Sequence, residues 1–299
     1  MKFTFSVRKK TLKDYPLMER LDELFDGIKC VLPEGYGVVT ASNWRHFPGL
    51  QFMLYSLRKR YDIPILVYDV GMTKEQLEWC EHVPGLIVAP DFNPGFKKLD
   101  YWEAWVKPLY IKNSPFKKSF WIDCDTVVTG ELIEIIEESG DKPLFTADHT
   151  GVKEGTYNNE TLYGMLPIEG LEKDCGEYLN TGVFLVDNQR DISLIDEWCN
   201  CVIAADKNPN IAKSITCWDQ GACKWALQKL KLTDTINIAK SFNFPATSRQ
   251  FAFPATPTAI GVLINTIRGA ILDRVVVYHW MGHPKFWVNW GEILPIEIV

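Results

Sequence analysis

Short apolar runs alternate with amphipathic segments through the first half of the chain, and this alternation limits the folds that the chain can adopt. Four of the runs predict strands: YGVVTAS (36–42), IPILVYD (63–69), GLIVAP (85–90) and SFWID (119–123). The segments between them carry apolar residues at helical spacing, such as Leu50, Met53, Leu54 and Leu57, and YWEAWVKPLYI (101–111) is expected to form one helix. Apolar strands separated by helices are typical of a parallel sheet that is covered on both faces. We therefore expect an α/β fold with a mostly parallel sheet flanked by helices.

The second half of the chain continues this pattern less regularly. Three more apolar runs predict strands at 143–147, 181–187 and 274–280, and helical patterns cover 191–205 and 218–230. An irregular stretch fills 148–177, and loops of that length are uncommon unless they are functional. The sequence FPAT occurs at 244–247 and again at 253–256, and we expect both copies to lie in loops. Because no linker of low complexity divides the chain, we expect a helical extension (1–35) and one domain (36–299).

Composition argues against some classes of partner. The net charge is -6 and the pI is near 5.5, so nucleic acid is disfavoured as a partner. No stretch approaches the roughly 18 apolar residues of a membrane span. The eight cysteines include no C-x-x-C pair, and the N-terminal residues show no apolar core of a secretion signal. We therefore expect reduced thiols and a cytoplasmic location.

Two aspartates follow the fourth apolar run with one residue between them, in the sequence WIDCD. Side chains at i and i+2 of an extended segment point to the same face, so Asp123 and Asp125 aim at one spot. Unpaired carboxylates are costly next to an apolar strand, and two like charges held together favour a cation. Because ligands of parallel sheets bind beyond the carboxyl ends of the strands, the position of this pair predicts a site.

Three interpretations of this D-x-D motif differ in their chemistry. In the first, the aspartates are helix caps or members of surface ion pairs. In the second, DCDTVV matches the D-x-D-x-[TV] signature of haloacid dehalogenase-like phosphohydrolases, in which the aspartates are nucleophile and acid. In the third, they hold Mn²⁺ or Mg²⁺, and the ion clamps the diphosphate of a nucleotide sugar.

The stretch HWMGHPKFW (279–287) favours the third interpretation. His279 can offer an imidazole to Mn²⁺, which accepts mixed nitrogen and oxygen ligands. Gly282 allows the backbone to approach a phosphate closely, and Lys285 can place a positive charge on it. The dehalogenase-like interpretation explains none of these residues, and it expects its motif on the first strand of the sheet.

In the order of its motifs, the sequence resembles the retaining GT-A glycosyltransferases, especially glycosyltransferase family 8. The family's C-terminal pattern H-x-x-G-x-x-K-P-W corresponds to His279, Gly282, Lys285, Phe286 and Trp287, with phenylalanine in place of the proline. Other segments resemble family motifs in the family's order: VVTASNWRHFPGLQFMLYSL, WVKPLYIKNSPFKKSFWIDCD, EYLNTGVFLVD and WDQGACKWAL. The resemblance covers roughly residues 36–290, and it implies a nucleotide-binding part over about 36–130 and a part for donor sugar and acceptor over about 131–299.

The resemblance also implies a role for individual residues. The metal ligands would be Asp123, Asp125 and His279. Nucleotide and diphosphate would be bound by Thr40, Ala41, Asn43, Cys124, Gly282 and Lys285. The donor sugar would be held by Lys107, Asn180, Thr181 and Asp219. Asp219 and Gln220 would be the catalytic pair that faces the reacting carbon, with Gln220 near the developing oxocarbenium charge.

The sequence thus predicts a metal-dependent glycosyltransferase that uses a nucleotide sugar and retains the anomeric configuration. The expected donor is a UDP-sugar, although Ser42 and Asn43 stand where the family usually has an acidic residue. A glycan, a protein, a lipid or a modified nucleic-acid base would each fit as acceptor, with nucleic acid disfavoured by the acidic composition. Two alternatives stay open: a dehalogenase-like phosphohydrolase, and a catalytically silent protein that binds a sugar nucleotide without turnover.

Overall fold

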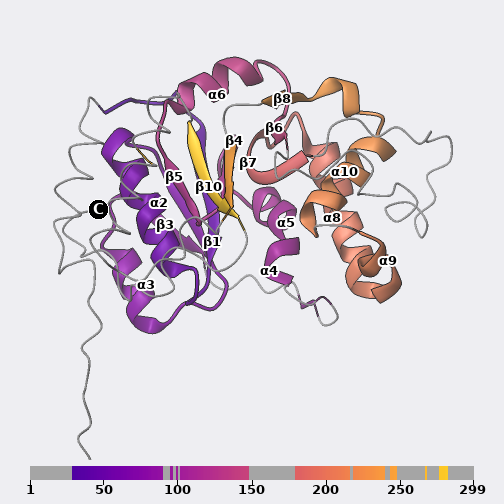
Figure 1. Cartoon of the computed structure of the whole chain (residues 1–299), viewed down its shortest axis with the longest axis horizontal. Helices are drawn as coiled ribbons and strands as arrows, with labels where there is room; N and C mark the ends of the chain where they lie inside the picture. The colour runs from indigo at the N-terminus through magenta and orange to yellow at the C-terminus, as the bar shows by residue number, and fades with distance from the viewer. Residues whose placement is uncertain are drawn as a thin grey trace, which may run out of the picture.

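The computed structural model describes residues 29–89, 95–96, 99, 102–147, 179–215, 218–239, 243–247, 267 and 276–281. Its centre is a seven-stranded sheet with helices on both faces (Figure 1). Across the sheet, the strands follow the order β3 (Leu86–Ala89), β2 (Ile65–Asp69), β1 (Tyr36–Ser42), β4 (Lys118–Ile122), β7 (Leu179–Asp187), β6 (Leu144–Ala147) and β8 (Asn237–Ala239). The predicted α/β fold is confirmed.

The sheet is mostly parallel, with one reversed strand at its centre. The pairs β1–β2, β2–β3, β1–β4 and β6–β8 are parallel, whereas β7 runs antiparallel to both β4 and β6. Ile122, the last residue of β4, pairs with Val183 of β7. The reversal therefore places the first residues of β7 beside the chain that leaves β4 toward Asp123.

Alternation along the strands builds two hydrophobic clusters. Val38, Phe120 and Ile122 face the cluster that contains α2 (Phe47–Arg60), α3 (Lys74–Glu81) and α6 (Leu132–Ser139). Val39 and Trp121 face the other cluster, with α5 (Lys107–Lys112), α8 (Ile192–Lys207) and α10 (Asp219–Lys229). Neighbouring residues of a strand point to opposite faces, so each apolar run supplies both layers.

A small second sheet lies next to the carboxyl end of β4. It joins β5 (Thr126–Val128), β10 (Val277–Met281) and β9 (Asn243–Thr247) in the order β5-β10-β9. The FPAT segment at 244–247 was expected to be a loop, and that expectation is wrong because β9 pairs in parallel with β10. His279 pairs with Thr126 across the antiparallel β5–β10 ladder, so the small sheet carries this histidine back to the D-x-D motif.

The stretch 101–111 was expected to form one helix, and the structure divides it in two. α4 (Trp102–Trp105) ends before Val106, and α5 begins at Lys107 with Pro108 in its first turn. Proline has no N–H to donate and its ring disfavours a continuing helix, but it suits the first turn of a new one. The break makes Lys107 the first residue of α5.

The remaining described elements are α9 (Pro209–Ser214) and the short 3-10 helix η2 (Thr233–Thr235). None of the described helices has both the length and the apolar composition to cross a bilayer. Several predictions concern residues outside the described ranges: the N-terminal helix before residue 29, the irregular stretch 148–177, Gly282 and Lys285.

Candidate active site

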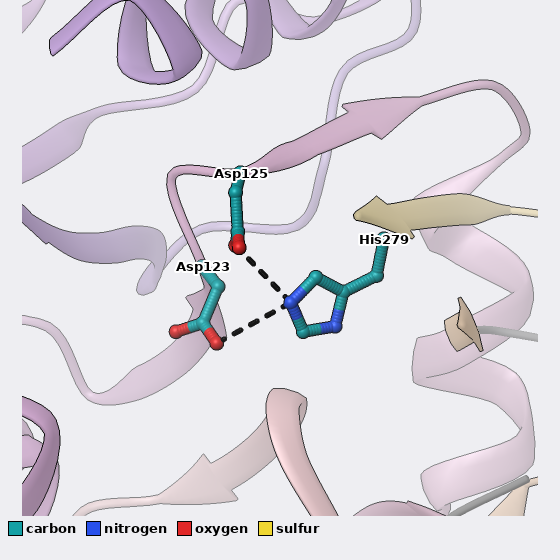
Figure 2. A group of neighbouring side chains, drawn as sticks. All are labelled: Asp123, Asp125 and His279. Atoms are coloured by element: carbon teal, nitrogen blue, oxygen red, sulfur yellow. Dashed lines mark ion pairs between the residues drawn. The ribbon is translucent and has the colours of Figure 1, made fainter. Parts of the chain in front are cut away.

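Asp123, Asp125 and His279 converge at the carboxyl end of β4 (Figure 2). Nε2 of His279 lies 3.1 Å from Oδ1 of Asp125 and 3.6 Å from Oδ2 of Asp123. One ligand atom from each residue lies within 4.8 Å of the others, and Asp125 and His279 are buried. Carboxylate oxygens and an imidazole nitrogen at this spacing fit one divalent cation, as the sequence predicted.

Gly182 makes room for the histidine. Its carbonyl accepts a hydrogen bond from the backbone N–H of Asp123 at 2.8 Å, which ties β7 to the D-x-D turn. A Cβ on Gly182 would lie 2.3 Å from Cε1 and 2.6 Å from Nδ1 of His279. The imidazole therefore packs directly on the backbone of β7, and only glycine permits that approach.

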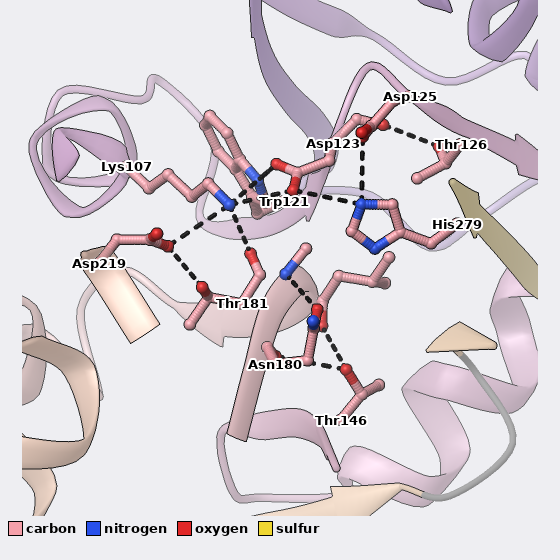
Figure 3. Close-up of polar contacts among 12 residues, drawn as sticks. Lys107, Trp121, Asp123, Asp125, Thr126, Thr146, Asn180, Thr181, Asp219 and His279 are labelled. Atoms are coloured by element: carbon pink, nitrogen blue, oxygen red, sulfur yellow. Dashed lines mark hydrogen bonds and ion pairs between the residues drawn. The ribbon is translucent and has the colours of Figure 1, made fainter. Parts of the chain in front are cut away.

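Lys107 links the cluster of Asp123, Asp125 and His279 to Asp219 (Figure 3). Its Nζ lies 3.0 Å from each carboxylate oxygen of Asp123 and 3.4 Å from Oδ2 of Asp219. It also donates to the carbonyl of Thr181 at 3.1 Å. Burial alone would lower the pKa of Lys107, but Asp123 and Asp219 raise it above the usual value, so this lysine is an ammonium.

Asp219 is buried at the start of α10. Its Oδ2 accepts a short hydrogen bond from the hydroxyl of Thr181, and its backbone carbonyl accepts one from the indole of Trp198 at 3.0 Å. Burial raises the pKa of Asp219 to about 6, although Lys107 and the Thr181 hydroxyl act in the opposite direction. Asp219 is therefore mostly a carboxylate at neutral pH, held by Lys107 and by β7.

The charges of this group do not balance. Among the described residues of this group, the formal charge is -2 when Asp123, Asp125 and Asp219 are carboxylates, Lys107 is an ammonium and His279 is neutral. Buried charges need a partner, and a divalent cation between the two aspartates and the histidine would supply the missing two charges. The residues therefore fit such an ion by number, type and charge.

Asn180 and Thr181 lie at the start of β7, next to the same site. Oδ1 of Asn180 accepts from the backbone N–H of Gly182 at 2.7 Å, and its carbonyl accepts from the hydroxyl of Thr146 at 3.3 Å. The carboxamide oxygen of Asn180 thus helps to shape the strand beside His279. The role that the sequence assigned to Asn180, holding sugar hydroxyls, stays a prediction.

The residues predicted for the nucleotide lie at the carboxyl end of β1. Thr40 is completely buried, and Ala41 is partly buried. Oδ1 of Asn43 accepts from the backbone N–H groups of Arg45 and His46, so its carboxamide caps the turn that leads into α2. Asp69 of β2 is the register partner of Ser42, which places a carboxylate beside the position where the family has its acidic residue.

The sequence analysis missed Trp121. Its indole N–H donates to Oδ1 of Asp123 at 2.6 Å, and the ammonium of Lys107 lies 5.6 Å from the centre of its ring. The i, i+2 spacing that singled out the two aspartates also holds between Trp121 and Asp123. The same spacing could therefore have identified Trp121 as a hydrogen-bond donor to Asp123 from the sequence.

The remaining predicted residues lie in the turn after β4, in α10 and outside the described ranges. Cys124 forms the turn between the two aspartates and packs on the cluster that contains α2. Gln220 is half-buried in the first turn of α10, one residue after Asp219. Gly282 and Lys285 lie outside the described residues.

Neither models of protein families nor curated protein sequences gave a match to this chain. Among solved structures, the galactosyltransferase LgtC in complex with donor and acceptor sugar analogues is similar, with a TM-score of 0.56 and 18% identity over 86% of this chain and 92% of that chain. An active-site mutant of LgtC gives a TM-score of 0.52 and 17% identity at the same coverage. The apo bifunctional glycosyltransferase WbbM gives 0.51 and 13% identity, over 87% of this chain and 48% of that one.

Identities this low show a shared fold. The described strands and helices, with the reversed strand beside Asp123, belong to the GT-A fold of these glycosyltransferases, and the predicted fold class is confirmed.

Proposed function

We propose that this protein is a metal-dependent glycosyltransferase that moves a sugar from a nucleotide-sugar donor, with a UDP-sugar the first candidate, to an acceptor hydroxyl. The observation that carries the proposal is the convergence of Asp123, Asp125 and His279 at the carboxyl end of β4 in a GT-A fold. The similar structures support the reaction class, because LgtC is a galactosyltransferase and was solved with donor and acceptor sugar analogues.

The proposed cofactor is Mn²⁺ or Mg²⁺, held by Asp123, Asp125 and His279. When bound, such an ion offsets the negative charge that develops on a departing diphosphate. The imidazole favours Mn²⁺ over Mg²⁺, because Mg²⁺ prefers oxygen ligands. Gly282 and Lys285 complete the proposed diphosphate site on the strength of their spacing after His279.

The residues of this chain would orient the donor sugar next to the ion. Asp219 offers a carboxylate whose position is fixed by Thr181 and Lys107. Lys107 touches both Asp219 and Asp123, so it can hold the sugar-binding carboxylate and the metal-binding carboxylate at a constant separation. Gln220, next in the chain, is the group that we propose lies near the oxocarbenium charge. The proposal includes retention of the anomeric configuration, because the sequence resembles the retaining enzymes of glycosyltransferase family 8.

A cytoplasmic location is part of this proposal, and it is consistent with the buried Cys80, Cys199, Cys201 and Cys223, which form no disulfide. A dehalogenase-like phosphohydrolase is disfavoured by the GT-A fold and by the position of the D-x-D motif after the fourth strand of the chain. In addition, Asp123 accepts hydrogen bonds from Trp121 and Lys107, which makes its carboxylate a poor nucleophile.

Donor hydrolysis tests the proposal without knowledge of the acceptor. The protein is incubated with UDP-, GDP-, TDP- and CMP-sugars and Mn²⁺, with and without a chelator, and released nucleotide is measured. We expect chelator-sensitive release from one donor. Asp125→Asn removes a proposed metal ligand. Loss of a residue that only orients a metal ligand typically lowers metal affinity or activity about 10–100-fold, so this variant should lower nucleotide release by more than that.

The matched control is Asp196→Asn, since Asp196 forms an exposed ion pair with Lys112 at 2.7 Å, away from the site. This variant should release nucleotide like the unchanged protein. Thermal stabilisation by a donor without release would point to the silent binder, and the absence of both would overturn the proposal.

A further inference from the structure

Trp121 donates a hydrogen bond to Asp123, one of the proposed metal ligands. It belongs to β4 and is 3% exposed, and its indole N–H reaches Oδ1 of Asp123 at 2.6 Å. An N–H donor to a carboxylate at this distance forms a strong, charge-assisted hydrogen bond. Oδ1 of Asp123 is therefore held by the indole.

The indole itself is held by a stack of aromatic rings. The ring of Trp121 lies 6.1 Å from Tyr110, with 7° between the planes, and 6.2 Å from Phe184, with 12° between the planes. Tyr68 continues the stack beyond Tyr110, and Phe145 continues it beyond Phe184. Rings packed on both faces leave the indole one orientation, so the direction of its N–H is set by the core of the molecule.

The two oxygens of Asp123 consequently differ. Oδ1 accepts from Trp121, while Oδ2, which also accepts from Lys107, faces Nε2 of His279 at 3.6 Å (Figure 3). Lys107 does not distinguish the two oxygens, because its Nζ lies 3.0 Å from both, so without the indole donor the carboxylate could turn about its last bond. The indole thus favours the arrangement in which Oδ2 is presented to the cluster.

We propose that Trp121 is a positioning residue for the metal site, which makes Asp123 bind the cation through Oδ2 alone. This inference rests on the proposed function, because it assigns a role toward the cation that the function requires. Partners of metal ligands orient the ligand, and their loss typically lowers metal affinity about 10–100-fold.

The test compares Mn²⁺ affinity in three proteins by measuring free Mn²⁺ with electron paramagnetic resonance. Trp121→Phe keeps an aromatic ring in the stack and removes the N–H, and we expect about a 10-fold rise in the dissociation constant for Mn²⁺. Trp79→Phe is the matched control, because Trp79 is also buried but its indole nitrogen has no hydrogen-bond partner among the described residues. That variant should bind Mn²⁺ like the unchanged protein.

Melting temperatures without metal separate positioning from packing. A purely structural role would lower the melting temperature of Trp121→Phe well below that of Trp79→Phe and leave the Mn²⁺ affinity unchanged, and that outcome would overturn the inference. If the unchanged protein binds no Mn²⁺, the proposed metal-dependent function fails as well. If it binds Mn²⁺ and Trp121→Phe binds equally well or better, only the role of Trp121 fails.

If Trp121→Phe does not fold, a measurement on the unchanged protein can test the role of Trp121. In protein labelled with ¹⁵N in the indole groups, the short hydrogen bond to a carboxylate should move the Trp121 N–H proton signal furthest downfield. Sub-stoichiometric Mn²⁺ should broaden that signal first, because one carboxylate separates the indole from the ion. Early broadening of other indole signals, with the downfield signal unaffected, would contradict the proposal.

Discussion

At the scale of single residues, Gly182 limits what the metal site can tolerate. A Cβ at this position would meet the ring of His279 at 2.3 Å, so Gly182→Ala must push the imidazole away from Asp125. We expect a loss of Mn²⁺ affinity of at least about 10-fold, similar to the loss of an orienting partner. Overpacking should also lower the free energy of unfolding by about 1–3 kcal/mol. Calorimetric Mn²⁺ titration and urea unfolding measure the two effects.

Gly37→Ala is the control for overpacking alone. A Cβ on Gly37 would lie 2.3 Å from the ring of Phe116, a clash of the same size in strand β1. This variant should lose comparable stability and keep its Mn²⁺ affinity. Equal Mn²⁺ affinities in both variants would show that His279 does not bind the ion.

Lys107 is expected to be essential for stability as well as for function. It faces the carboxylates of Asp123 and Asp219 in a buried position, and Lys107→Met would leave both without their cation. Removing one partner of a buried ion pair typically costs about 3–5 kcal/mol, and we expect a loss of that order in the free energy of unfolding, measured in urea without metal. Lys112→Met breaks an ion pair of about half-exposed residues and should cost less than about 1 kcal/mol. Similar losses in the two variants would contradict the ion-pair geometry at Lys107.

Residue spacing was enough to predict some of this site. Asp123 and Asp125 were found because i, i+2 spacing after a strand sends both side chains to one face. The contact between Gly182 and His279 depends on the β4–β7 and β5–β10 pairings. Those pairings join residues far apart in the sequence, and no local spacing specifies them. The contact between Trp121 and Asp123, by contrast, follows i, i+2 spacing.

At the scale of elements, local signals predicted helix and strand positions better than helix breaks. The strand expected at 36–42 is β1, and the helical patterns at 191–205 and 218–230 correspond to α8 and α10. The periodicity of residues 101–111 continues through Val106, so it concealed the break that Pro108 favours. The strand β9 was missed because Pro245 argues against a strand, although proline is tolerated at the edge of a sheet, where β9 lies.

The contact between α2 and β5 provides a prediction for two elements. The hydroxyl of Ser56 in α2 donates to the carbonyl of Met53 at 2.9 Å and accepts from the backbone N–H of Val128 in β5 at 2.9 Å. Ser56→Ala leaves the buried N–H of Val128 without this acceptor, which should cost about 1–3 kcal/mol in the free energy of unfolding. Hydrogen exchange at Val128 should become faster.

Ser119→Ala is the control, because its hydroxyl donates to the side chain of Ser114 at 3.1 Å and, within the described part of the chain, holds no backbone group of another element. It should change the free energy of unfolding by less and leave exchange at Val128 unaltered. Unchanged exchange at Val128 in Ser56→Ala would mean that α2 does not hold β5.

At the scale of the whole molecule, the two hydrophobic clusters and the reversed strand explain why the site lies where it does. The apolar runs predicted a sheet covered on both faces. The structure agrees, because the same strands contribute side chains to both clusters. The reversal of β7 was not predictable from its apolar run, because an apolar run is equally consistent with either strand direction. It nevertheless decides the site, since it brings Asn180, Thr181 and Gly182 next to Asp123.

The charge imbalance of the site predicts how the whole fold responds to metal. Among the described residues, folding gathers Asp123, Asp125, Asp219 and Lys107 into one buried group with an excess of two negative charges. A divalent cation that binds the folded chain should therefore stabilise it, by about 2.7 kcal/mol at a concentration 100 times its dissociation constant. For a protein of this size class that corresponds to a rise of about 5 °C in the melting temperature, which a chelator should reverse.

Asp125→Asn should lose most of this rise, and NaCl at matched ionic strength should not reproduce it, because screening acts on exposed charges more than on buried ones. An equal rise in Asp125→Asn would show that the cation binds elsewhere, and the excess charge would then have to be neutralised by protonation.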